Sequence, residues 1–195
     1  MKKNNSDKNI NRCGWTGDDE LMIKYHDEEW GVPIHDDRKL FEFITLDAFQ
    51  AGLSWSIVLH KRENFRKAFN NFRPEIIADY NSKKISELLY NKAIIRNKLK
   101  IEATINNAKA FLEIQKEYGS FDKYIWKFTG NTVIQNKWAT PKDIPVRTVI
   151  SDKMSSDLKK RGFKFVGSTI CYAFMQAAGM VNDHLTTCFR YEQLS

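Results

Sequence analysis

Cysteine and histidine residues stand in two pairs near opposite ends of the sequence. Cys13 and His26 lie near the start, and His184 and Cys188, four residues apart, lie near the end. A spacing of four places two side chains on the same face of a helix. Two thiolates and two imidazoles satisfy tetrahedral Zn²⁺, and four protein ligands leave no position open for a substrate. The pairs predict one structural zinc ion per chain; because neither spacing is that of a zinc finger, two unrelated Cys/His pairs are the alternative.

A second group combines aromatic rings with one acidic residue. It consists of Trp15, Tyr25, Trp30 and Trp55, with Asp47 between the last two along the chain. Aromatic faces can sandwich a flat nucleobase, and a carboxylate can recognise the polar edge of that base. The alternative is that the rings fill the core and that Asp47 lies on a helix surface.

A third group is basic. Residues 88–101 join two predicted helices by a tight turn, and Arg96, Lys98 and Lys100 open the second helix. Backbone amides at a turn that enters a helix can hold a phosphate, and basic side chains add sequence-independent attraction. The pattern is typical of a helix-hairpin-helix element that binds DNA; an ordinary connection with a solvated basic face is the alternative.

The elements that must position these groups are predicted to be helices. Apolar residues at spacings of three and four predict a helix capped by Asp36 or Asp37, one from Ser54 to about Asn70, and one over 98–118 that ends at Gly119. Shorter helices are expected after Pro74, after Ser82 and over 122–128. Because strict two-residue alternation is hard to find, the predicted class is all-α.

The last third of the chain begins with a different pattern. Residues 129–150 hold Gly130, Pro141 and Pro145 without a clear period, which predicts a long loop. Helices are expected again from Ser151 to a stop at Gly162, and then in a segment that ends at Gly179. Residues 1–11 are polar and predict a flexible tail, which leaves one domain over 12–195.

Composition limits the function classes. The 195 residues carry a net charge of +7, which permits a polyanionic partner. Residues 167–181 form the longest weakly polar run, too short to span a membrane, and the first residues lack the apolar stretch of a secretion signal. Three cysteines, an odd number, do not form a disulfide framework, so a reducing cytoplasm is expected.

Several longer motifs resemble one bacterial family. They are Arg12-Cys-Gly-Trp15, Tyr25-His-Asp-Glu-Glu-Trp-Gly-Val-Pro33, Gln50-Ala-Gly-Leu-Ser-Trp55, Lys61-Arg-Glu-Asn64, Ile94-Ile-Arg-Asn97, Lys160-Arg-Gly-Phe-Lys-Phe-Val-Gly-Ser-Thr-Ile-Cys-Tyr172 and Val181-Asn-Asp-His184. Their order and spacing resemble the bacterial DNA-3-methyladenine glycosylase I family from about residue 12 to residue 188.

The resemblance implies a two-lobed fold of the helix-hairpin-helix glycosylase superfamily, with the hairpin near 82–118 and a zinc site joining the chain ends. It carries the metal ligands onto Cys13, His26, His184 and Cys188, and the base pocket onto Trp15, Tyr25, Trp30 and Trp55. The pocket carboxylate falls on Asp47, where the family has Glu. Leu53 falls where the family inserts a side chain into the DNA stack, and Ala93 stands in the hairpin where Gly is frequent.

The resemblance further implies a monomeric enzyme that hydrolyses the N-glycosidic bond of 3-methyladenine in double-stranded DNA and leaves an abasic site. Asp47 and Tyr25 would read the base edge, the three tryptophans would stack on the base, and Arg96 and Lys98 would contact phosphates. No lysine nucleophile is expected, and therefore no strand-cutting activity. A damage sensor that binds the base without hydrolysis is the alternative, and a hydrolase with a catalytic zinc is disfavoured by the closed ligand set.

Overall fold

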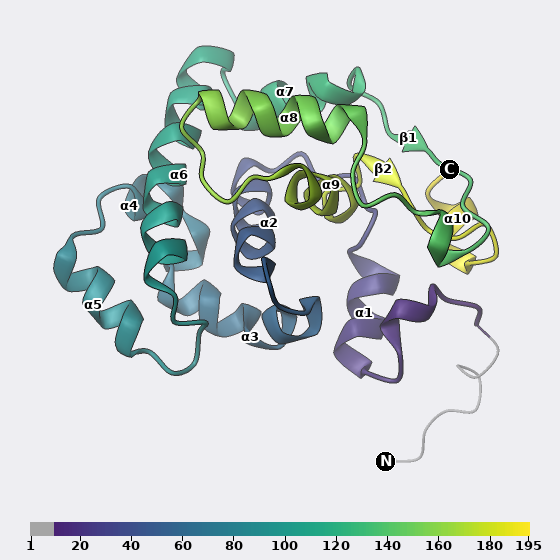
Figure 1. The fold of residues 1–195 in the computed structure, drawn as a ribbon, viewed down its shortest axis with the longest axis horizontal. Coiled ribbons are helices and arrows are strands. Elements are labelled where there is room, and N and C mark those ends of the chain that lie inside the picture. The colour runs from purple at the N-terminus through teal and green to yellow at the C-terminus, as the bar shows by residue number, and fades with distance from the viewer. Residues whose placement is uncertain (1–9) are drawn as a thin grey trace.

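The computed structural model describes residues 10–195, and most of them are helical (Figure 1). The helices are α1 (Glu20–Glu28), α2 (Asp37–Gln50), α3 (Trp55–Ala68), α4 (Pro74–Ile77), α5 (Ser82–Tyr90), α6 (Lys98–Tyr118), α7 (Phe121–Ile125), α8 (Val149–Lys160), α9 (Ser168–Ala177) and α10 (Phe189–Gln193). Four short 3₁₀ turns, Gly14–Thr16, Asn70–Phe72, Trp126–Thr129 and Pro141–Asp143, supplement them in the described part of the chain.

Local capping explains where the central helices begin and end. The Asp36 carboxylate accepts a hydrogen bond from the Lys39 amide at 2.8 Å and caps α2. The Asn97 side chain caps α6 in the same way, and Gly119 ends α6 in the left-handed conformation at φ 84°. The predicted boundaries of α6 are therefore confirmed, and the capping signals account for them.

Helix α2 forms the centre of the molecule and packs against α3, α6 and α9 (Figure 1). Its residues 40–49 are all buried, and Phe41 packs against Phe111 of α6 with ring centroids 5.0 Å apart. Burial on all sides of a helix is unusual for an amphipathic segment and indicates a core element. The side chains of residues 40–49 are thus held by neighbours on every side, including Asp47, the one acidic group that α2 contributes to the site.

The long loop predicted over 129–150 is only partly correct. Ile134–Gln135 (β1) pairs in parallel with Val181–Asn182 (β2), and α8 begins at Val149. Strands of two residues are too short for alternation to show in the sequence, so the sequence gives no signal for them. The short sheet joins the loop to the C-terminal segment.

The N-terminal segment is attached to the C-terminal one. The Asn11 carbonyl accepts a hydrogen bond from the Phe189 amide at 3.0 Å, and the Asn11 side chain donates to the Thr187 carbonyl at 2.7 Å. The predicted tail over 1–11 is therefore wrong for residue 11, and residues 1–9 lie outside the described residues.

Across residues 10–195, no helix is both long enough and apolar enough to cross a membrane. The longest, α6, runs for 21 residues but includes many charged ones.

A tight contact at Gly179 gives a test of this packing. Gly179 has φ +68°, and a Cβ built there would lie 2.3 Å from the Val32 carbonyl carbon and 2.4 Å from the Pro33 nitrogen. We expect Gly179→Ala to lower the free energy of unfolding by about 3 kcal/mol, because backbone strain and overpacking add. Gly130→Ala is the matched control, since Gly130 has the same φ and nothing within 4 Å of its Cβ position. Equal losses in urea unfolding would show that the contact with residues 32–33 is unimportant.

Candidate active site and metal centre

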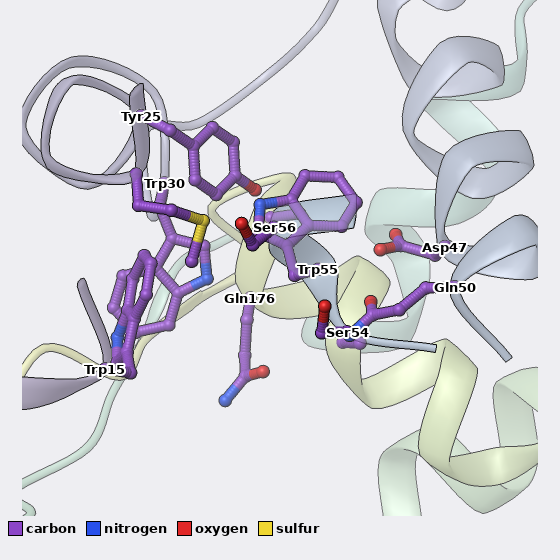
Figure 2. A pocket seen from close by; sticks show the side chains of 12 residues that line it. Trp15, Tyr25, Trp30, Asp47, Gln50, Ser54, Trp55, Ser56 and Gln176 are labelled. Carbon is purple, nitrogen blue, oxygen red and sulfur yellow. The ribbon is translucent and has the colours of Figure 1, made fainter. Parts of the chain in front are cut away.

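A pocket of about 440 Å³ opens between α1, α2, α3 and α9 (Figure 2). Five of the twelve residues that line it are those predicted from the sequence, namely Trp15, Tyr25, Trp30, Asp47 and Trp55. They come from four separate segments of the chain, so only the folded structure brings them together. The size is of the order expected for a small flat ligand.

The aromatic rings form two of the pocket walls. Trp15 and Trp30 meet edge to face with ring centroids 5.1 Å apart, and Tyr25 and Trp55 lie 5.1 Å apart at an angle. Trp15 is 38% exposed, whereas Tyr25 and Trp30 are buried. The alternative that all these rings are ordinary core residues is therefore wrong for Trp15, and the other three present part of their surface to the pocket.

Asp47 is buried within α2 and is only 2% exposed. Figure 2 shows its carboxylate reaching from α2 toward Trp55. Its Oδ2 atom has no hydrogen-bond partner among residues 10–195, and burial raises the pKa of the carboxyl well above its ordinary value. The alternative that Asp47 lies on a helix surface is wrong. A cation that enters the pocket would stabilise the ionised form of this group.

Tyr25 remains protonated in this site. Burial, followed by the nearby charges of Asp47 and Glu29, raises the pKa of its hydroxyl well above the ordinary value. The buried Arg62 guanidinium lies 5.9 Å from the Tyr25 ring centroid and donates two hydrogen bonds of 2.7 Å to the half-buried Glu29 carboxylate. Tyr25 can therefore act as a hydrogen-bond donor but not as a base.

Helix α9 and several smaller residues, none of them predicted from the sequence, also contribute to the pocket. The other residues of the pocket are Met22, Gln50, Ser54, Ser56, Ala173, Gln176 and Ala177. The Gln176 amide nitrogen donates a hydrogen bond to Asp183 Oδ2 at 2.7 Å, and this bond fixes the orientation of the side-chain amide. A glutamine within the apolar segment 168–177 was the signal that could have indicated a site on this helix.

The four predicted metal ligands meet in one buried cluster. The potential ligand atoms of Cys13, His26, His184 and Cys188 all lie within 4.8 Å of one another. The Cys188 sulfur lies 3.4 Å from His26 Nε2 and 3.5 Å from His184 Nδ1. The alternative of two unrelated pairs is therefore wrong. A hydrogen bond from the Cys13 thiol lowers the pKa of Cys188, so this site favours a thiolate.

Both histidine rings are oriented by a partner on the nitrogen that faces away from the cluster. His26 Nδ1 lies 2.7 Å from the Asp27 carboxylate, and His184 Nε2 donates to the Trp30 carbonyl at 3.1 Å. Second partners of this kind are typical of metal-bound histidines. The donor set and its orientation fit a tetrahedral metal ion such as Zn²⁺.

The predicted helical turn between His184 and Cys188 is wrong. Residues 184–188 form a turn in which the Cys188 amide donates to the Leu185 carbonyl at 2.7 Å, and α10 starts only after Cys188. A spacing of four allows either geometry, because a tight turn also returns the chain to its start.

The two helices predicted on either side of the basic segment are present as α5 and α6, and residues 91–97 join them. Arg96 and Lys98 are exposed, and Leu53 is 40% exposed in the loop between α2 and α3. Lys100 is different, because it is buried and its ammonium group donates to the Phe49 and Ala51 carbonyls. The prediction that Lys100 attracts phosphate is therefore wrong.

Comparison with known proteins defines the class. The family of methyladenine glycosylases matches residues 15–191. The chain is 47% identical to DNA-3-methyladenine glycosylase 1 of Escherichia coli (strain K12), over 93% of this chain and 97% of that protein. The chain belongs to the methyladenine glycosylase family.

Solved structures agree with this assignment. A crystal structure of 3-methyladenine DNA glycosylase I matches with a TM-score of 0.90 and 50% identity, over 92% of this chain and 98% of that one. A variant of 3-methyladenine DNA glycosylase I, crystallised in complex with 3-methyladenine, matches with a TM-score of 0.89 and 33% identity, over 92% and 97%. The mostly helical fold is thus the fold of this family.

The environment of Asp47 predicts a stability effect with a defined pH dependence. Because burial raises the folded-state pKa, the folded protein binds more protons than the unfolded chain once the pH exceeds the ordinary value of 3.8. Stability therefore falls as the pH rises toward the folded-state pKa. We expect Asp47→Asn to remove this loss, so that its stability relative to the unmodified protein increases from about pH 4 to about pH 7.

Urea unfolding at several pH values measures this difference. Asp18→Asn is the matched control, because Asp18 is exposed and close in sequence to the same site. If the free energies of unfolding of the unmodified protein and of Asp47→Asn change in parallel across the pH range, burial does not destabilise the ionised form of the Asp47 carboxyl group.

Proposed function

We propose that the chain removes 3-methyladenine from alkylated double-stranded DNA by hydrolysing the N-glycosidic bond, leaving an abasic site. The observation that carries this proposal is the buried Asp47 carboxylate, without a partner at Oδ2 within the described chain, beside a pocket of aromatic rings. Membership of the methyladenine glycosylase family and the relative crystallised with 3-methyladenine support it. Detection of free 3-methyladenine after incubation with methylated duplex DNA tests it, and binding without release would instead support a damage sensor.

The chemistry follows from the charge of the substrate. Methylation at N3 makes the purine in DNA cationic and already a good leaving group, so the site needs little acid catalysis. The enzyme extrudes the nucleotide, and Trp30 and Trp55 stack on the cationic base. Asp47 attracts the positive charge in a site from which water is largely excluded. The Tyr25 hydroxyl donates a hydrogen bond to the base edge.

Bond breakage leaves an oxocarbenium-like sugar, which water captures. None of the described residues that line the pocket is a lysine, so the site offers no amine for a Schiff base with the sugar. This supports a monofunctional glycosylase without strand cleavage.

DNA binding falls to the hairpin and the neighbouring loop. Arg96 and Lys98 contact phosphates from the exposed start of α6, and the backbone turn before α6 holds a phosphate by its amides. Leu53 enters the space that the extruded base leaves, since it is exposed at the tip of the loop after α2.

We further propose that the Cys/His cluster holds one structural Zn²⁺. Cys13, His26, His184 and Cys188 would complete its coordination, so the ion would cross-link the two chain ends and take no part in hydrolysis.

A single domain over 12–195 with two helical lobes supplies pocket, hairpin and loop together, so a monomer is sufficient for the reaction. The three buried cysteines form no disulfide, which supports a reducing cytoplasmic location.

The role of Asp47 is tested by charge removal. Asp47→Asn keeps the size of the side chain but removes its charge, and we expect kcat/KM for excision to fall roughly ten- to a thousand-fold, about 1.4–4 kcal/mol. Asp47→Glu retains the charge and restores the longer family side chain, so its activity should exceed that of the Asn variant. Steady-state release of 3-methyladenine from one methylated duplex compares the three proteins. Full activity in Asp47→Asn would show that the carboxylate does not recognise the base.

The zinc proposal predicts about one zinc ion per chain after dialysis. Cys188→Ala should lose this zinc and lower the free energy of unfolding by at least about 2 kcal/mol, because the cross-link between the chain ends weakens. Cys171→Ala is the matched control, since Cys171 is also buried but lies outside the cluster. Elemental analysis that finds no zinc in the unmodified protein would contradict the proposal.

The phosphate contacts are tested by salt dependence. Arg96→Ala should weaken binding to damaged and undamaged duplexes by the same factor and reduce the slope of log K against log salt by about 1. Fluorescence anisotropy at several salt concentrations measures both quantities. A loss confined to the damaged duplex would place Arg96 at the base rather than at the phosphates.

A further inference from the structure

The most unusual lysine of the described chain is Lys100, in the first turn of α6. It is 6% exposed, although lysine is almost never fully buried unless it is paired. Its ammonium group donates to the Phe49 carbonyl at 2.8 Å and to the Ala51 carbonyl at 2.6 Å. No carboxylate within residues 10–195 forms an ion pair with it. A buried charge held only by main-chain carbonyls needs a physical reason.

The reason lies at the end of α2. The last carbonyls of a helix lack intrahelical partners and carry partial negative charge, so a cation there is favourable. The last turn of α2 holds no basic residue of its own. Lys100 supplies the cation from α6, which packs against α2 (Figure 1). The buried ammonium group thus serves as a cap that reaches from one element to another.

This bond also fixes the loop that follows α2. Gly52 has φ +79°, and the Leu53 amide donates to the Gln50 carbonyl at 2.6 Å, so residues 50–53 form a tight turn. Because Lys100 holds Phe49 on one side of this turn and Ala51 within it, the position of exposed Leu53 depends on the position of α6.

Lys100 connects the Leu53 loop to the basic hairpin that precedes α6. Lys100 lies two residues after Lys98 and three after the α6 cap Asn97, so its backbone belongs to the turn of helix that follows the hairpin loop. The Lys61 ammonium group adds a second tie, from α3 to the hairpin carbonyl of Ala93 at 3.3 Å. Only Lys100, however, joins the hairpin helix to the Leu53 loop among the hydrogen bonds of residues 10–195.

We propose that Lys100 is a positioning residue that sets the Leu53 loop relative to the phosphate-binding hairpin. When the hairpin binds the DNA backbone, the Lys100 bonds hold Leu53 at the base stack, where it supports extrusion of the damaged nucleotide. This inference rests on the proposed glycosylase function. It assigns Lys100 no contact with the base and none with a phosphate.

The test compares two methylated duplexes. In one, 3-methyladenine is opposite thymine; in the other, it is opposite an abasic site, where extrusion needs less unpairing. We expect Lys100→Met to slow single-turnover excision from the paired duplex by about ten- to a hundred-fold and from the unpaired one by less than about threefold. Lys109→Met, on an exposed position of α6, should leave both rates unchanged.

The ratio of the two rates separates positioning from stability, because partial unfolding lowers both rates by the same factor. Equal losses on both duplexes would overturn the inference. If Lys100→Met does not fold, Lys100→Gln, which keeps a donor on a shorter side chain, should show the same change in ratio. Absence of 3-methyladenine release by the unmodified protein on either duplex would instead refute the proposed function.

A double-mutant cycle gives the second readout. If Lys100 acts through Leu53, adding Lys100→Met to Leu53→Ala should reduce paired-duplex excision by less than about threefold beyond Leu53→Ala alone. Lys100→Arg retains a cation that can reach both carbonyls, so its ratio should lie closer to that of the unmodified protein. Multiplicative losses in the double variant would contradict an action through Leu53.

Discussion

The burial of the Asp47 carboxylate beside aromatic rings is the constraint on which the rest of the site depends. Ionised carboxyl groups are costly to remove from water, and Oδ2 finds no partner within residues 10–195. The fold tolerates this cost because Leu46 and Phe49, which flank Asp47 in α2, are completely buried and hold the helix backbone in place. A group that the fold leaves unsatisfied is ready for a ligand of opposite charge, and a cationic purine has both the charge and the flat faces that this pocket fits.

The pocket and the Cys/His cluster share the same short helix. In α1, Tyr25 lines the pocket while the next residue, His26, belongs to the cluster. Trp30 serves both, because its ring lines the pocket and its carbonyl accepts from His184. The union of the two chain ends therefore positions Trp15 and Trp30, while α2 and α3 supply Asp47 and Trp55. A change in the cluster is expected to reach the pocket through these residues.

Much of this arrangement can be predicted from the sequence, for identifiable physical reasons. Helix α6 has a capping Asn, a regular apolar stripe and a terminal Gly, and each signal is local. The four metal ligands can be predicted because structural zinc sites are built from cysteine and histidine, and both residue types are rare in this chain. By contrast, the two-residue strands carry no period, and the burial of Lys100 depends on carbonyls fifty residues away. Gln176 was missed for the same reason, since its place in the pocket arises from the packing of α9 against α2.

If the proposed function is correct, the pocket selects a base by its positive charge. The most direct measurement uses one duplex preparation that contains both cationic 3-methyladenine and the neutral lesion hypoxanthine, with the released bases separated by chromatography. We expect the protein to release 3-methyladenine and to leave hypoxanthine in the DNA. Release of both bases at comparable rates would show that recognition does not depend on the charge of the base, and therefore that the Asp47 carboxylate does not select the substrate.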